Sequence, residues 1–405
     1  MKKFLSIVAF ACLVLMGCSS SEKKQPEIEK NDYAFIDDSF KKAEEVYKKA
    51  LKENTDLNAI PRSVHNDGTI MTGEPGDWTC GFFPGSLWFL YENTHADFWL
   101  NNAREWTENL EEVKNKETTH DIGFMIYCSF GNGYRLTKDE SYLEIINQAS
   151  TTLSKRFNPI VGCTKSWNRY KFSEKWEFPV IIDNMMNLEM LMFSFQNTGD
   201  SSYYTIATSH ANTTMENHFR NDYSSYHVVD YDSLTGEVIQ KNTHQGYSDS
   251  SSWARGQTWG LYGYTFMYRD TKDTAYLNQA KNIADYIMNN PKIPEDKIPY
   301  WDYDDPKPDP AKDVSAAALA ASALLDLSQL VEDEKLSTSY LNYATDVLRT
   351  LSSKTYFNEL EDNHHFLLAH ATGNYPRGTE IDKPLSYADY YYLEGLLKLK
   401  KLVNK

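Results

Sequence analysis

The stretch TKDESY, residues 137–142, recurs as TGDSSY at 198–203 and as TKDTAY at 271–276. Each copy follows an apolar segment with helical character and precedes an amphipathic one. The aspartate in each copy is a natural N-cap for the second helix, because its carboxylate accepts hydrogen bonds from the unpaired backbone N–H groups there. Each copy therefore predicts a helical hairpin.

Looser copies at 92–97 and 331–334 predict two more hairpins, and a sixth is split between 386–399 and 36–54. One hairpin of this size cannot bury its apolar face alone, so neighbours must stack. The expected inner helices are apolar on nearly all sides and the outer ones keep a polar face, which indicates two concentric layers. The predicted fold is all-α, an (α/α)6 barrel. An open helical solenoid is the alternative, and closure by the terminal helices favours the barrel.

Three inserts interrupt the helical pattern: 157–178, 226–245 and the proline-rich 291–312. In the second, YHVVDYD and EVIQKN flank SLTG, which predicts a short β-hairpin.

The first 17 residues have the features of a lipoprotein signal peptide. Two lysines precede an apolar run that is shorter than the ~20 residues needed to span a bilayer. The ending Leu-Met-Gly-Cys resembles a bacterial lipobox, so cleavage would leave Cys18 as the lipidated residue. We expect 18–34 to be a flexible tether and 35–405 a single domain, exported and held on the periplasmic side of the outer membrane. The alternative is a soluble secreted protein cut nearby.

The formal net charge of −16 argues against a nucleic-acid partner, because phosphate contacts require clustered Lys and Arg. Beyond the signal and Cys18, three cysteines remain (Cys80, Cys128, Cys163), and their odd number predicts buried free thiols. The chain has no CxxC or HExxH pattern, so we expect neither a metal site nor a cofactor.

Polar and aromatic side chains collect where the predicted inner helices begin. In a toroid these starts lie at one end of the ring, and a concave mouth with aromatic walls is the default ligand site. Trp78, Trp253 and Trp259 flank the polar clusters and could stack on sugar rings, although any one tryptophan could equally serve core packing.

Asp183, in FPVIIDNMMNLEMLMF (178–193), lies among apolar residues. It could be a helix N-cap or a buried carboxylate held by backbone donors. Alternatively, apolar surroundings raise its pKa so that it delivers a proton near neutral pH. Asp121, preceded by His120, is the expected partner, since a second carboxylate separates the two ionisations.

Arg255 lies at the start of a predicted inner helix, in WARGQ. A planar guanidinium at the mouth of an acidic protein favours an anionic substrate. The alternative is a structural salt bridge to Asp249 or a neighbour.

Several long motifs resemble, in order and spacing, the unsaturated glucuronyl hydrolases of glycoside hydrolase family 88. They include WTCGFFPGSLW (78–88), HDIGFM (120–125), IIDNMMN (181–187), HVVDYDSLTG (227–236), HQGYSDSSSWARGQTWGLYG (244–263) and EIDKPLSYADYYYLE (380–394). The resemblance implies a catalytic (α/α)6 domain and an anionic partner, an oligosaccharide left by a polysaccharide lyase. Such enzymes hydrate the C4=C5 double bond of the terminal Δ4,5-unsaturated uronic acid.

The resemblance also implies roles for individual residues. Asp183 would protonate C4 and Asp121 would assist it. The expected substrate-binding residues are Trp78, His120, Trp167, His227, Gln245, Trp253, Arg255 and Trp259. Some family members that prefer sulfated fragments carry a serine- and lysine-rich loop just before the last inner helix. Here that region reads ATGNYPRGTEIDKPLSY, in which Arg377 and Thr379 could contact a sulfate or simply lie on the surface.

Three other functions fit parts of this pattern. An unsaturated rhamnogalacturonyl hydrolase would share the fold and the proton chemistry but act on pectin fragments. A conventional hydrolase would cleave saturated glycans. A surface glycan-binding lipoprotein would have no turnover to lose on changing Asp183. The HDIGFM and WARGQ contexts favour the glucuronyl group.

Overall fold

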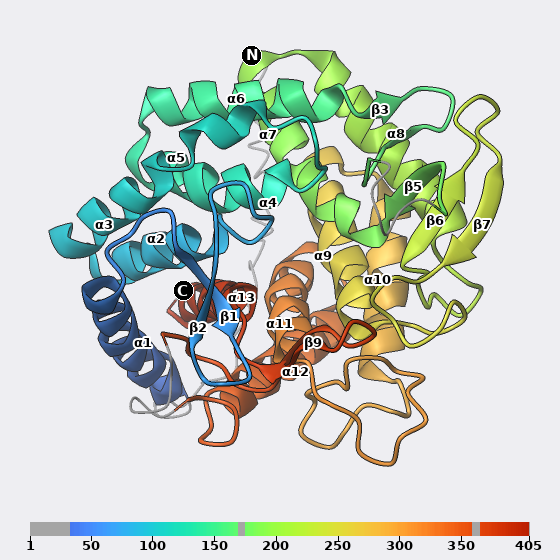
Figure 1. Cartoon of the computed structure of the whole chain (residues 1–405). Helices are drawn as coiled ribbons and strands as arrows, with labels where there is room; N and C mark the ends of the chain where they lie inside the picture. Colours follow the sequence, from blue (N-terminus) through green and yellow to red (C-terminus); the bar gives the residue numbers. More distant parts are fainter. Residues whose placement is uncertain (1–32, 169–174, 359–364, 405) are drawn as a thin grey trace, which may run out of the picture.

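Two concentric rings of helices form the protein, as the repeated phrase predicts (Figure 1). The computed structural model describes residues 33–168, 175–358 and 365–404, so the predicted signal peptide, Cys18 and most of the tether lie outside the described residues. The inner ring contains α2 (Phe82–Thr94), α4 (Ile122–Ile126) continued by the π-helix η3 (Tyr127–Gly131) and by α5 (Asn132–Thr137), α7 (Leu188–Thr198), α9 (Ala254–Thr271), α11 (Val314–Leu330) and α13 (Ser386–Val403). The outer ring contains α1 (Ala34–Glu53), α3 (Asp97–Glu108), α6 (Glu140–Ser154), α8 (Ser201–Asn217), α10 (Thr274–Met288) and α12 (Glu334–Leu351).

The ring is closed by its terminal helices. α13 packs against both α11 and α2, and α1 packs against α2 and α13. The sixth hairpin is therefore made of the two ends of the chain, as predicted. The open solenoid is excluded, and the fold is an (α/α)6 toroid.

The repeated phrase works as the sequence predicts. Asp139, Asp200 and Asp273 are the N-caps of α6, α8 and α10, and each carboxylate accepts a hydrogen bond from the backbone N–H two residues on. The tyrosine that ends each phrase is buried in the core. The looser copy at 92–97 differs, because Ala96 is the N-cap of α3 and provides no side-chain cap. The phrase thus fixes both where the outer helix starts and which face it buries.

Short antiparallel strands decorate the helical ring. The predicted hairpin is present as β6 (Val228–Tyr231) and β7 (Val238–Asn242), and β5 (Phe178–Ile181) extends it to a three-stranded sheet in the order β5-β6-β7. The sequence did not predict the hairpins β1 (Ile60–Val64)–β2 (Ile70–Gly73) and β8 (Ala371–Asn374)–β9 (Thr379–Lys383), nor the two-residue pair β3 (Phe157–Asn158)–β4 (Cys163–Thr164). In Figure 1 β1, β2 and β9 lie over the face of the ring turned toward the viewer.

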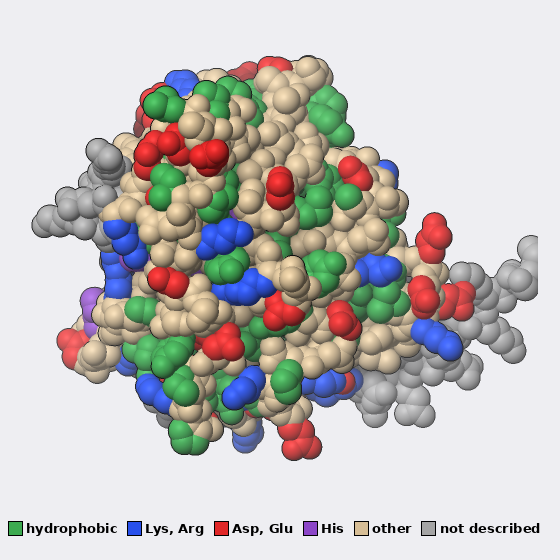
Figure 2. All heavy atoms as spheres, turned by 90° about the vertical axis from the view of Figure 1, so that its right-hand side faces the viewer, with side chains coloured by type: hydrophobic (Ala, Val, Ile, Leu, Met, Phe, Trp, Pro, Cys, Tyr) green, Lys and Arg blue, Asp and Glu red, His purple; other side chains and the backbone are tan. Residues whose placement is uncertain are grey.

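Two short 3-10 helices complete the described secondary structure, η2 (Glu111–Asn115) and η4 (Ile182–Asn187). The proline-rich insert 291–312 contains neither a helix nor a named strand. Cys80, Cys128 and Cys163 are buried free thiols, as predicted. Within the described ranges no helix has the length and apolar character needed to cross a membrane. On the side of the molecule that Figure 2 shows, acidic and basic side chains are interspersed.

A layer of aromatic rings crosses the centre of the toroid. Phe82, Phe124, Trp259 and Tyr391 form a closed cycle, with adjacent ring centroids 5.1–6.0 Å apart. Each of the four is at most 2% exposed. We call these four residues the aromatic layer. It separates the end of the ring where the inner helices begin from the end where they finish.

Candidate active site

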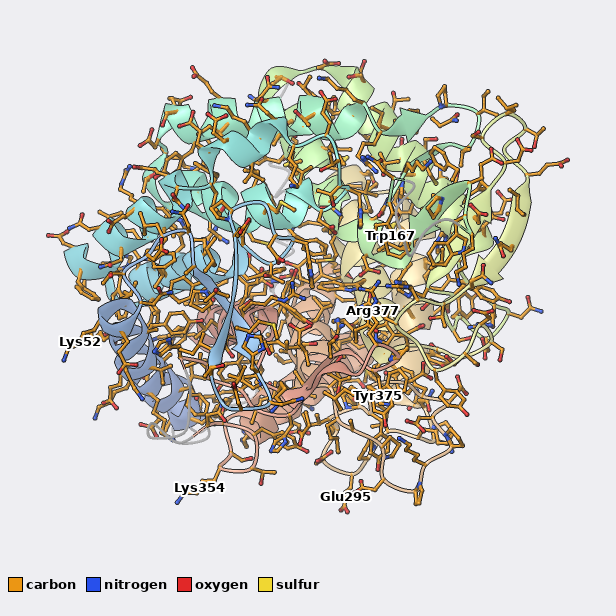
Figure 3. All side chains as sticks on the ribbon, in the orientation of Figure 1. Lys52, Trp167, Glu295, Lys354, Tyr375 and Arg377 are labelled. Carbon is orange, nitrogen blue, oxygen red and sulfur yellow. The ribbon has the colours of Figure 1, made fainter. Side chains whose placement is uncertain are left out.

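A cavity of about 280 Å³ opens where the inner helices begin. Residues that are far apart in the sequence meet there, as predicted for a toroid. The cavity is lined by Arg62, Trp78, His120, Asp121, Trp167, Ile181, Asp183, His244, Gln245, Arg255, Gly373, Asn374, Arg377, Thr379, Glu380 and Tyr387. In Figure 3 Trp167 and Arg377 lie close to one another at this face. The cavity size suits the terminal residue of a chain rather than a long oligosaccharide.

Asp183 lies in η4, directly after the buried strand β5, and is only 8% exposed. The N-cap of η4 is Ile181 and that of α7 is Asn187, so the prediction that Asp183 caps the helix is wrong. Its Oδ2 atom is buried and has no hydrogen-bond partner in the part of the chain that the structure describes. Burial raises the pKa of the Asp183 carboxyl to about 7, against the opposing charges of His120 and Arg255. The predicted upward shift is confirmed, and a proton is available on Asp183 near neutral pH.

Asp121 has the opposite environment although it lines the same cavity. Its Oδ2 accepts a hydrogen bond from Thr119 Oγ1 at 2.7 Å, and its Oδ1 lies 3.0 Å from His120 Nε2. Burial acts to raise the pKa of Asp121, but His120 and Thr119 outweigh it and lower the pKa below its usual range. Asp121 in turn raises the pKa of Asp183. The two ionisations are thus pushed apart, as the sequence predicted.

His120 lies between two acceptors. Its Nδ1 is 2.8 Å from the carbonyl oxygen of Ser166, which can only accept, so Nδ1 carries a proton. Its Nε2 faces the Asp121 carboxylate. The ring therefore holds Asp121 in place at the wall of the cavity.

His227, the residue before β6, lies next to Asp183. Its Nδ1 accepts hydrogen bonds from the backbone N–H groups of His244 and Gln245, both at 3.1 Å. Burial lowers the pKa of His227 well below its usual value. The ring is therefore neutral, and its proton is on Nε2, which lies 3.7 Å from Asp183 Oδ2.

Arg255 is almost completely buried, yet it borders the cavity. Its Nη1 contacts Asp313 Oδ2 and the Thr372 carbonyl oxygen, each at 2.6 Å, and its Nη2 donates to the Gly373 carbonyl oxygen at 2.6 Å. The alternative prediction of a structural salt bridge is confirmed, but the acidic partner is Asp313 and Asp249 as the partner is wrong. Arg255 thereby joins α9 to α11 and to strand β8, while its charge also acts on Asp183.

The remaining predicted residues divide into two groups. Trp78, Trp167, Gln245, Arg377 and Thr379 line the cavity with the two aspartates, His120 and Arg255. His227, Trp253 and Trp259 lie behind its wall. The Trp253 ring contacts the His227 ring, with their centroids 4.7 Å apart, and the guanidinium carbon of Arg255 lies 4.6 Å from the Trp253 centroid. Trp259 belongs to the aromatic layer. Direct substrate contacts by these three residues stay predictions.

No protein-family model matches the chain. A curated protein of Formosa agariphila, described as an unsaturated glucuronyl hydrolase, is 40% identical over 410 residues and covers 100% of both chains. The chain belongs to the unsaturated glucuronyl hydrolase family. A solved structure of an unsaturated glucuronyl hydrolase specific for heparin has a TM-score of 0.88 and 45% identity, and the match covers 92% of this chain and 98% of that one. An unsaturated chondroitin disaccharide hydrolase of Streptococcus agalactiae is 32% identical, over 88% of this chain and 91% of its own.

Sequence reasoning missed several cavity residues of this glucuronyl hydrolase family member: Arg62, His244, Asn374, Glu380 and Tyr387. Arg62, on β1, pairs with Asp77 and with Glu380 on β9, each at 2.8 Å. No local signal marks Arg62 in the sequence, because its partner Glu380 is 318 residues away. His244 and Tyr387 do lie inside motifs quoted for the family, so their neighbours could have pointed to them.

The side chains that line the cavity can supply acid and base chemistry. Asp183 holds a proton near neutral pH, Asp121 is ionised, and the cavity wall carries aromatic rings together with three arginines. Among the described residues, no three His, Cys, Asp or Glu side chains are grouped to hold a metal ion.

Proposed function

We propose that the protein is a glycoside hydrolase that releases the Δ4,5-unsaturated uronic acid from the non-reducing end of lyase-generated oligosaccharides. The observation that carries this proposal is Asp183, a carboxyl whose pKa burial raises to about 7 at the wall of a small cavity. Protonating the carbon of an enol ether requires an acid that is still protonated at working pH. The family membership supports the same reaction.

The reaction follows from the two ionisation states. Asp183 transfers its proton to C4 of the unsaturated ring, which leaves positive charge at C5. The Asp183 carboxylate then takes a proton from a water molecule as the water oxygen bonds to C5. The resulting hemiketal opens and expels the remaining sugar. Asp121 keeps its charge throughout, binds sugar hydroxyls and holds the pKa of Asp183 high.

The substrate is a glycosaminoglycan fragment. The relatives named above are described as acting on heparin and on chondroitin disaccharides. Three arginines, Arg62, Arg255 and Arg377, border the cavity although the chain as a whole carries a formal charge of −16. A planar guanidinium can bind a carboxylate through two hydrogen bonds, so this group of arginines favours the carboxylate of a uronic acid. We assign Trp78 and Trp167 as stacking surfaces and Arg377 and Thr379 as contacts for a sulfate on the following sugar.

Loss of ultraviolet absorbance from the double bond tests this function. The protein should remove the absorbance of unsaturated chondroitin or heparin disaccharides and release a saturated sugar. Activity on rhamnogalacturonan disaccharides alone would assign the protein to the pectin-directed class instead. Cleavage of a saturated disaccharide would contradict hydration.

We also propose that the protein is exported and anchored through a lipid on Cys18. The support is the sequence Leu-Met-Gly-Cys after a short apolar run. Metabolic labelling with a radioactive fatty acid should mark the wild-type protein, and Cys18→Ser should abolish the label. An unlabelled wild-type protein recovered from the medium would favour the soluble secreted alternative.

A further inference from the structure

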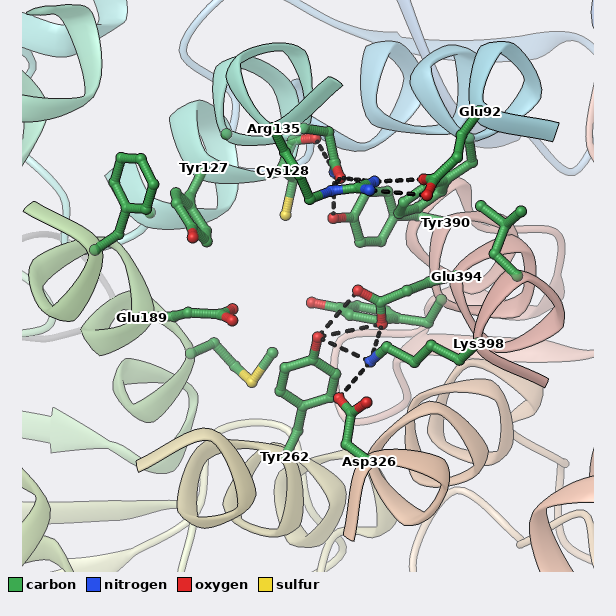
Figure 4. A pocket seen from close by; sticks show the side chains of 18 of the residues that line it. Glu92, Tyr127, Cys128, Arg135, Glu189, Tyr262, Asp326, Tyr390, Glu394 and Lys398 are labelled. Atoms are coloured by element: carbon green, nitrogen blue, oxygen red, sulfur yellow. Dashed lines mark hydrogen bonds and ion pairs between the residues drawn. The ribbon is translucent and has the colours of Figure 1, made fainter. Parts of the chain in front are cut away.

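A second cavity, of about 450 Å³, lies at the other end of the toroid, where the inner helices finish. Its wall includes Glu92 from α2, Arg135 from α5, Glu189 from α7, Tyr262 from α9 and Glu394 from α13 (Figure 4). Phe124 and Tyr391 of the aromatic layer also border it. The layer therefore forms the inner end of this cavity, and the proposed reaction uses none of the polar residues around it.

Most of the charged groups that line this cavity are paired with one another. Arg135 binds both carboxylate oxygens of Glu92, and Arg269 donates to Glu189 at 2.8 Å. Lys398 contacts both Asp326 and Glu394, at 2.7 and 3.1 Å. A charged ligand would have to compete with these pairs, and separating a partly buried pair is costly. The wall is therefore better suited to a neutral polar molecule.

Several hydrogen-bonding groups of the wall are still available. Within the described ranges, Glu189 Oε1 accepts a hydrogen bond from Arg269, whereas Glu189 Oε2 and the hydroxyl groups of Tyr127 and Tyr391 have none. Figure 4 shows the Glu189 carboxylate directed into the open space that Tyr127, Tyr390 and Glu394 also border. The Glu394 carboxylate is fixed by Tyr262 and Lys398, which orients it without covering it.

Aromatic faces alternate with these polar groups. Phe89, Phe124, Tyr134, Phe193 and Tyr390 all border the cavity. Oriented carboxylates and hydroxyls beside aromatic rings match the two faces of a sugar, whose hydroxyls need hydrogen bonds and whose C–H groups pack on rings. We infer that this cavity is a second, non-catalytic binding site for a neutral saccharide of one or two rings, with Glu189, Tyr127, Tyr391 and Glu394 as its polar contacts.

Titration calorimetry with a panel of sugars tests the inference. Glucose, N-acetylglucosamine and cellobiose are the neutral probes, glucosamine is the cationic probe and glucuronate the anionic one. At least one neutral probe should bind saturably. Glu189→Gln and Tyr127→Phe, which preserve side-chain shape, should each weaken that binding by about five- to tenfold.

Two control variants locate the binding. Glu111→Gln makes the same chemical change on an exposed residue outside this cavity, and Arg377→Ala alters the mouth of the first cavity; both should leave the affinity unchanged. Thermal melting of each variant checks that the fold is kept. The inference is overturned if no neutral probe saturates, if only glucosamine or glucuronate binds, or if Arg377→Ala abolishes binding while Glu189→Gln does not.

Discussion

His227 Nε2 and Asp183 Oδ2 face one another at 3.7 Å, and among the described residues neither atom has a hydrogen-bond partner. The two backbone N–H groups that donate to His227 Nδ1 fix the proton on Nε2. A neutral donor thus waits beside a carboxyl whose pKa burial raises to about 7. The Nε2–H group of His227 can therefore stabilise the negative charge that Asp183 acquires when it gives up its proton.

Replacing Asp183 removes the proton donor. We expect Asp183→Asn to lower kcat by about 10³-fold, in the range of a lost general acid. The fold should be kept, because an amide replaces a buried group of the same shape. Absorbance loss on an unsaturated disaccharide measures the rate. Asp97→Asn, on the exposed start of α3, is the matched control and should keep full activity. Substantial turnover by Asp183→Asn would rule out its assigned role.

The pH profile should report the same group. Asp183 must be protonated to act, so kcat/KM should fall as pH rises through about 7. Asp121 stays ionised over this range, because His120 and Thr119 lower its pKa. The raised pKa of Asp183 also means that this carboxyl holds its proton more tightly in the folded state than in the unfolded state, so its own contribution to stability should fall from about pH 4 to about pH 7. A rate that rises across pH 7 would contradict the assignment.

Removing the N–H donor of His227 should shift the pH dependence of kcat/KM. His227→Phe keeps a ring but deletes the N–H that favours ionised Asp183, so the pKa of Asp183 should rise further. We expect the alkaline limb of kcat/KM to shift to higher pH and kcat to fall. His210→Phe is a control, because that buried histidine bonds Thr164 and lies outside the cavity wall. An unchanged limb in His227→Phe would show that Nε2 does not act on Asp183.

The Arg255–Asp313 pair is buried at both ends. Arg255→Met leaves the Asp313 carboxylate without its partner and should lower the free energy of unfolding by about 3–5 kcal/mol. Adding Asp313→Asn should restore part of that loss, since the unpaired charge is then removed. Urea unfolding measures both. Strictly additive losses would mean that the two side chains do not depend on each other.

Sulfate recognition can be tested separately from catalysis. Arg377→Ala and Thr379→Ala should raise KM for a sulfated disaccharide by about three- to tenfold and leave the unsulfated one nearly unchanged. Steady-state kinetics on the two substrates gives the comparison. An equal change on both would indicate that these residues act on the uronate end or on the fold.

The sequence predicted what its local patterns encode. The repeated phrase gave the outer-helix starts because capping is a short-range effect between an aspartate and the N–H groups two or three residues on. The raised pKa of Asp183 was predictable because the apolar residues beside it in the sequence contribute to its burial. By contrast, Arg62 and Glu380 come from hairpins at opposite ends of the chain, and neither hairpin carries a strong strand pattern. The second cavity depends on where six helices finish, which no single motif records.

The aromatic layer of Phe82, Phe124, Trp259 and Tyr391 makes the ring a cup rather than a tube. A polysaccharide cannot thread through it, so only a free chain end can reach Asp183. The released uronate must leave by the opening through which the substrate entered. Each turnover therefore ends with the cavity empty, and the protein removes a single unsaturated residue from the end of a chain instead of sliding along that chain.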